Sequence, residues 1–172
     1  MAWRAKAVWG IDGINRLAAF ACHLLLTIIT VVTVLQVFLR YFLNRPTSWS
    51  EEIALLCLIW FGLLAVAVGI RRHEHVAITF LRDLCPAPIA SALDYGAQIA
   101  IAAFMFVVMF YADDLIAITG VQVLPASSLP KWLLYLPAII GGALGTFNAL
   151  ANIILRDVHG AAHGALAASD DR

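Results

Sequence analysis

The sequence predicts an all-α integral membrane protein with four transmembrane helices and a short amphipathic helix lying in the membrane interface. Of its 172 residues, 63% are hydrophobic and only 13% are charged. Soluble domains carry about 25% charged residues and roughly half apolar ones, so a chain this apolar needs lipid as its solvent. Four apolar stretches, each long enough to cross a bilayer as a helix, account for the excess.

The first two spans are predicted at residues 17–39 and 53–70. As α-helices they measure about 34 Å and about 27 Å, and the second is near the lower limit for a bilayer. The apolar core of the first is longer than that of a signal peptide, and no A-x-A-like cleavage site follows it. We therefore expect a retained helix, preceded by an N-terminal arm at residues 1–16.

The third and fourth spans are predicted at residues 89–111 and 133–155, which completes a membrane domain over residues 17–155. Between spans two and three, Val76, Phe80 and Leu84 recur every four residues, which favours a helix in the interface over an irregular loop. The connectors are too short to fold as domains. The Gly/Ala-rich tail, residues 156–172, is expected to be flexible.

The positive charges predict the orientation of these spans. Eight Lys and Arg residues flank the membrane on the side of the two termini, against three on the opposite side. Because cytoplasmic flanks are enriched in Lys and Arg, both termini are expected in the cytoplasm. The connectors at residues 40–52 and 112–132 are then expected to face outward.

The connector FLRYFLNRPTSWSEE, residues 38–52, concentrates polar groups between two spans. Ser48 and Glu51 fit an S-x-x-E capping box for the second helix. The two arginines of the stretch are natural partners for its two glutamates, because unpaired charges at this depth are costly. Adjacent carboxylates point about 100° apart on a helix, which suits an acid–base pair poorly. A structural hairpin with ion pairs is therefore favoured over a ligand site, and it comprises Arg40, Tyr41, Arg45, Pro46, Ser48, Trp49, Glu51 and Glu52.

Few polar side chains lie inside the spans. Asp94 is a functional candidate as an intramembrane carboxylate, although its place near the start of the third span puts it close to the interface. Asn148 and Asn152 lie one turn apart, and Gly141 and Gly145 form a GxxxG pair, both typical of helix packing. Packing within the chain and contact with a partner subunit are both open for these four residues.

Several other classes of function find little support. Eleven basic and eleven acidic residues leave no net charge, which removes the electrostatic case for nucleic acid. His73, Glu74 and His75 do not share a helix face and have no third ligand nearby, so no metal site is predicted. The three cysteines form no C-x-x-C pair. No catalytic residue and no cofactor is expected.

Three sequence blocks together resemble the small, Q-type (DctQ-like) membrane subunit of tripartite ATP-independent periplasmic (TRAP) transporters. The similarity runs from about residue 17 to residue 155. The first block is F-x-R-Y-x-x-N-R-P-x-S-W-x-E-E at residues 38–52, the second is R-R-x-E-H at residues 71–75, and the third is L-P-K-W with Tyr135 and Pro137 at residues 129–137.

The resemblance implies a non-catalytic subunit in a bacterial inner membrane, surrounded by lipid. It implies two partners: a large membrane permease subunit that carries the substrate and sodium sites, and a periplasmic substrate-binding protein that delivers an organic acid. The small subunit would brace the static scaffold of the large one. Substrate identity would then lie with the partners.

Two competing hypotheses come from other classes. A self-sufficient four-helix transporter, like the small multidrug exporters, would need a membrane-embedded Glu in its first helix, where this chain offers only His23 and Gln36. A membrane enzyme would need outward-facing cysteine pairs for disulfide oxidation or paired axial ligands for haem. The scaffold subunit is therefore the function that the sequence favours.

Overall fold

The computed structural model describes residues 2–44, 47–72 and 87–155. This part of the chain forms α1 (Ala2–Phe42), α2 (Ser48–Arg72), α4 (Ala87–Thr119) and α5 (Trp132–Ile154). Each helix is long and apolar enough to cross a membrane, which confirms the four predicted spans and the all-α class. The predicted interfacial helix and the tail lie outside the described residues.

Two helices extend further than predicted. α1 begins at Ala2, so the segment expected as an arm, residues 1–16, continues the first span as helix from residue 2 onward. Gly10 and Gly13 cost about 1 kcal/mol each in helix propensity, and packing of this segment against α5 offsets that cost. α4 continues past residue 111 to Thr119, because Asp113 and Asp114 are polar but do not break a helix.

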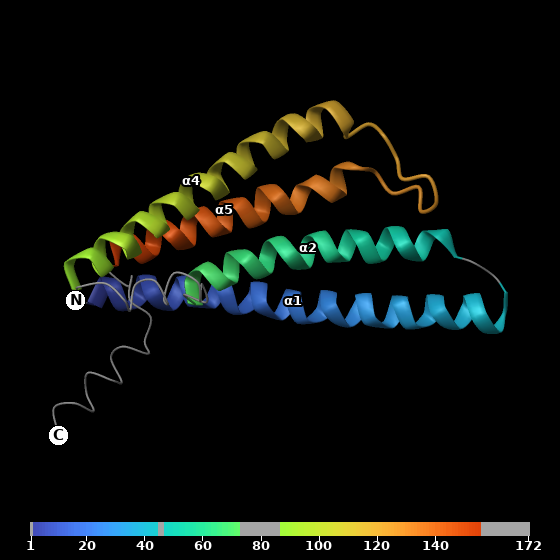
Figure 1. Ribbon diagram of the computed structural model, residues 1–172, viewed down its shortest axis with the longest axis horizontal. Coiled ribbons are helices and arrows are strands. Elements are labelled where there is room, and N and C mark those ends of the chain that lie inside the picture. The colour runs from blue at the N-terminus through green and yellow to red at the C-terminus, as the bar shows by residue number, and fades with distance from the viewer. Residues whose placement is uncertain (1, 45–46, 73–86, 156–172) are drawn as a thin grey trace, which may run out of the picture.

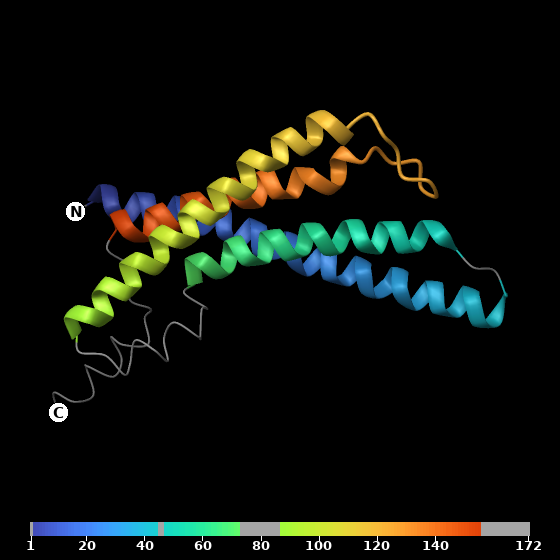
Figure 2. The same ribbon diagram turned by 45° about the horizontal axis from the view of Figure 1, so that its top comes forward.

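The helices form a layer in the order α1–α2–α5–α4. α2 packs against α1 and α5, and α5 packs against α2 and α4, so α1 and α4 stand at the two edges. In both views the α1–α2 hairpin and the α4–α5 hairpin lie side by side (Figures 1 and 2). We call the end where α1 finishes and α2 begins, with the connection at residues 120–131, the hairpin end. The opposite end, where α1 starts and α5 finishes, is the terminal end (Figure 1).

Small residues on α5 allow the two hairpins to approach closely. A Cβ atom at Gly141 would lie 3.0 Å from the Leu63 carbonyl oxygen of α2, and one at Gly142 would lie 2.9 Å from the Met105 carbonyl oxygen of α4. Gly145 meets side chains of both neighbours, Met105 and Ile70. The two consecutive glycines therefore face different neighbours, Gly141 the backbone of α2 and Gly142 the backbone of α4.

The helices differ greatly in how much of their surface the chain itself covers. In the most apolar stretch of α1, 6% of the residues are buried, against 33% in α5. α5 is central and packs along α2 and α4, with a smaller contact to α1 at the terminal end, whereas α1 leaves most of its circumference open. The edge helix α1 therefore offers a larger area than α5 to lipid or to another subunit.

Candidate functional site

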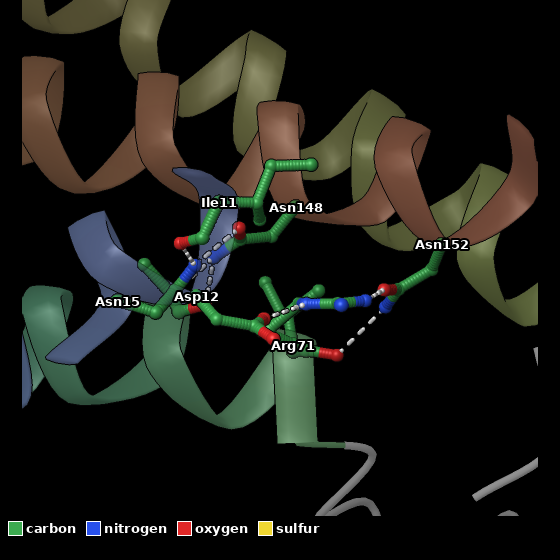
Figure 3. A network of polar contacts seen from close by, with 8 residues as sticks. Ile11, Asp12, Asn15, Arg71, Asn148 and Asn152 are labelled. Atoms are coloured by element: carbon green, nitrogen blue, oxygen red, sulfur yellow. Dashed lines mark hydrogen bonds and ion pairs between the residues drawn. The ribbon is translucent and has the colours of Figure 1, made fainter. Parts of the chain in front are cut away.

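A buried polar network joins three helices at the terminal end (Figure 3). The Arg71 side chain of α2 is 8% exposed, and its Nε donates to Oδ1 of Asp12 in α1 at 3.0 Å. Its Nη1 donates to Oδ1 of Asn152 in α5 at 2.7 Å. One guanidinium thus links α1, α2 and α5, and its fork of donors suits such a junction.

Two asparagine side chains complete this network one turn deeper in the layer. Asn15 of α1 and Asn148 of α5 exchange amide hydrogen bonds of 2.9 Å and 2.8 Å, and Asn148 Nδ2 also donates to the Ala67 carbonyl oxygen of α2 at 2.8 Å. Asn152 Nδ2 donates to the Ile70 carbonyl oxygen at 3.0 Å. Buried amides cost free energy unless they are paired, and these pairings hold three helices in one register.

These contacts place the predicted packing residues within this chain. Gly141, Gly145, Asn148 and Asn152 all lie buried between α5 and its neighbours in the described structure. Asn15 and Arg71, which the sequence interpretation did not assign to packing, bind Asn148 and Asn152, and Asp12 in turn binds Arg71. The spacing of Ile11 and Asn15, one helical turn apart, is the signal that could have indicated a packed face in the N-terminal segment.

At the hairpin end, Glu52 clamps the loop between α4 and α5. Its carboxylate accepts hydrogen bonds from the backbone N–H groups of Ala126 (3.0 Å) and Ser127 (2.7 Å) and from the Ser127 hydroxyl (2.6 Å). The loop is itself a small hairpin, with a bridge between Val123 and Pro130. Charge-assisted bonds of this kind fix the loop onto the start of α2.

The start of α2 differs in detail from the predicted capping box. The side chains joined across the first turn are Thr47 and Ser50, whose hydroxyl oxygens lie 2.8 Å apart, one residue before Ser48 and Glu51. Ser50 Oγ also donates to the Thr47 carbonyl oxygen at 2.6 Å. Thr47 directly precedes the helix, so it occupies the position where a hydroxyl can satisfy the free N–H groups of the first turn.

Among the described residues, both glutamates of this hairpin have neutral partners. Glu51 accepts a hydrogen bond from Gln36 Nε2 of α1 at 3.0 Å, and Glu52 binds the loop. Arg40 lies over the ring of Tyr41, 6.0 Å from its centroid. Arg45 and Pro46 lie outside the described residues, and Trp49 is half exposed at the start of α2.

A further tie between the hairpins originates from a proline. Pro137 has no N–H group, so within α5 it leaves the carbonyl of Leu133, four residues earlier, without its helical donor. The Trp60 indole Nε1 of α2 donates to this oxygen at 3.0 Å. The Trp60 side chain of α2 therefore replaces the backbone hydrogen bond that Pro137 removes from α5.

We expect Trp60→Phe to lower the free energy of unfolding in detergent by about 1 kcal/mol, because the Leu133 carbonyl loses its donor while most of the ring packing remains. The matched control is Trp132→Phe, since Trp132 is 38% exposed. Unfolding followed by circular dichroism measures both variants. Equal stability of the two would contradict the role given to the indole N–H.

Other predicted candidates are distributed as follows. Asp94 and Gln98 are both buried in the first half of α4. Within the described part of the chain, no group of three His, Cys, Asp or Glu side chains could hold a metal ion. His73, Glu74 and His75 lie outside that part. What the observed contacts accomplish is attachment of helix to helix and of loop to helix.

Comparison with known proteins gives this arrangement a family. The family model for the DctQ component of tripartite ATP-independent periplasmic transporters matches residues 29–158, which is 130 of the 172 residues. Over 88 residues the chain is 33% identical to the sialic acid TRAP transporter small permease protein SiaQ of Vibrio cholerae, covering 51% of each chain.

Two proteins of Haemophilus influenzae are also similar. The sialic acid TRAP transporter permease protein SiaT is 30% identical over 57% of this chain and 16% of its own length. A protein named as a TRAP transporter small permease protein is 24% identical over 76% of this chain and 81% of its own. The chain thus spans about half of SiaQ and a smaller part of SiaT. With most of its length matched by the family model and four helices able to span a membrane, the chain belongs to the DctQ family of TRAP transporter small permease subunits and is a multi-pass inner-membrane protein.

Proposed function

We propose that this chain is a non-catalytic brace for the scaffold of a large membrane permease subunit, in a sodium-driven transporter that takes up organic acids with a periplasmic substrate-binding protein. The observation that carries the proposal is how the chain uses its polar side chains. At both ends they tie helices and loops together, through Arg71 at the terminal end and Glu52 at the hairpin end. Such ties stiffen a subunit, which suits a fixed support rather than a moving carrier.

The substrate class is supported by the relatives. Two of them are named for sialic acid, a carboxylic acid, and a third, from Vibrio cholerae, is named for C4-dicarboxylates. The excess of Lys and Arg on the side of the termini supports a cytoplasmic location for both of them. In that orientation the loop held by Glu52 and the connector at residues 40–52 face the periplasm, where a binding protein docks.

The test is purification of the large subunit with and without this chain, followed by uptake into liposomes. With the binding protein, an organic acid and a sodium gradient present, we expect uptake only when both membrane subunits are present. Uptake by the large subunit alone would refute the bracing role. Uptake by this chain alone would favour the alternative of a self-sufficient four-helix transporter.

A further inference from the structure

His23 lies at the middle of the membrane-spanning part of α1. The depth of His23 in the membrane follows from the neighbouring Cys22, whose Sγ lies 4.0 Å from the Phe61 carbonyl oxygen of α2. Phe61 is nine residues after Glu52 and ten before Arg71, which mark the hairpin end and the terminal end of α2. At 1.5 Å per residue, His23 is therefore level with a point about 14 Å from either end, close to mid-membrane.

The His23 side chain points out of the layer at this depth. It is exposed, and its Nδ1 lies 2.6 Å from the Ala19 carbonyl oxygen of its own helix. A carbonyl oxygen can only accept, so this bond assigns the hydrogen to Nδ1. In the neutral ring Nε2 is then an acceptor, and no hydrogen bond reaches it from the described part of the chain.

Two hydroxyls continue the same face toward the hairpin end. Thr27 and Thr30 are exposed, and each donates its hydroxyl hydrogen to the carbonyl four residues earlier, at 2.9 Å. Residues at these spacings share one side of a helix. With the exposed rings and methyls of Phe20 and Val34 they form one stripe, which we call the His23 face: Phe20, His23, Thr27, Thr30 and Val34.

Lipid is a poor occupant for this face. Ionisable side chains inside a bilayer are costly, and in membrane proteins they almost always face other protein or a water-filled cavity. A second copy of this chain fits no better. His23, Thr27 and Thr30 each donate their side-chain hydrogen to a carbonyl of α1, so toward a partner they offer only acceptors. In a two-fold contact between copies, acceptors would therefore face acceptors. The occupant must bring a donor.

We propose that the His23 face is where a transmembrane helix of the large permease subunit packs, with a hydroxyl or amide donor placed at mid-membrane against His23 Nε2. This inference rests on the proposed function, which supplies the large subunit as partner. The open circumference of α1 leaves room for such a helix along the stripe. An interhelical hydrogen bond in a bilayer then adds to the van der Waals packing of the two helices.

The first experiment places a photo-crosslinking amino acid at Thr27 in the full chain, co-expressed with the large subunit in membranes. The expected result is an adduct whose mass equals that of the two subunits together. An adduct with a second copy of this chain, or with lipid alone, overturns the proposal.

The second experiment compares His23→Leu with His23→Gln by the strength of subunit association in detergent. We expect His23→Leu to weaken association roughly 3- to 30-fold, and His23→Gln, whose amide oxygen accepts the same hydrogen bond, to restore most of it. The unfolding of the isolated variants reports any loss of folding separately. Unchanged association in a folded His23→Leu variant overturns the proposal.

If the unaltered chain fails to co-purify with a large subunit, the proposed function itself fails. If it co-purifies but Thr27 gives no adduct with that subunit, only the proposal for the His23 face is wrong.

Discussion

Arg71→Met is expected to lower the free energy of unfolding by about 2–4 kcal/mol, since removing one member of a buried ion pair leaves its partners uncompensated. The guanidinium is 8% exposed and serves both Asp12 and Asn152, so its loss affects α1 and α5 at once. The upper end of the usual range is not reached, because the Asp12 side chain is 37% exposed and regains water. Unfolding of the purified chain in detergent, by added denaturant, gives the value.

Arg16→Met is the matched control for this change. It removes the same charge from the same end of the molecule, but Arg16 is exposed on α1, next to Asn15. We expect Arg16→Met to change stability by under about 0.5 kcal/mol, as is usual for surface substitutions. If both variants lost the same stability, the effect would belong to the total charge at this end and not to the network.

Gly142→Ala is expected to cost about 1–3 kcal/mol, because the new methyl group would overpack the contact between α5 and α4. The obstacle is backbone, the Met105 carbonyl oxygen at 2.9 Å, together with Met109 Cβ at 3.0 Å, so no side-chain rotation relieves it. The two helices must move apart along their contact. Thermal unfolding of the purified chain measures the loss.

Gly62→Ala supplies the comparison, since it makes the same chemical change in a helix of the same layer. A Cβ atom there has nothing within 4 Å, so only helix propensity applies, and Ala is favoured over Gly by about 1 kcal/mol. Opposite signs for the two variants are therefore expected. A loss in both would show that the close approach at Gly142 is not the cause.

The length of the apolar runs and their polar flanks were sufficient to predict the four helices. A transmembrane helix must cross the hydrocarbon core of the bilayer, so the thickness of that core sets both the length of the run and the positions of its flanks. The spans predicted at residues 17–39 and 89–111 are shorter than α1 and α4, since hydropathy marks where a helix leaves lipid and not where its hydrogen bonding stops. Gly120 directly follows the last residue of α4, and the low helix propensity of glycine is a local reason for the helix to end at Thr119.

The contacts at the site could be predicted only in part. Asn148 and Asn152 were recognisable as packing residues from their spacing on one helix. Their partners were not, because Asn15 lies 133 residues away from Asn148 along the chain, and no local pattern joins them. The N-terminal segment of α1 was interpreted only by its charges, so the packing of Ile11 and Asn15 was not predicted. For Glu52, the charge indicated that a partner was needed, but no local pattern indicated the N–H donors of the loop at Ala126 and Ser127.

The layer order has a consequence for biosynthesis. α1 and α2 leave the ribosome first and can form their hairpin at once, yet Asn15 and Arg71 find their α5 partners only after residues 148 and 152 have been made. Until then, the early hairpin has the Arg71–Asp12 ion pair but lacks the Asn148 and Asn152 partners of its amide and guanidinium groups. We expect these groups to bind Asn148 and Asn152 when α5 inserts. The α1–α2 hairpin would then favour the correct placement of α5.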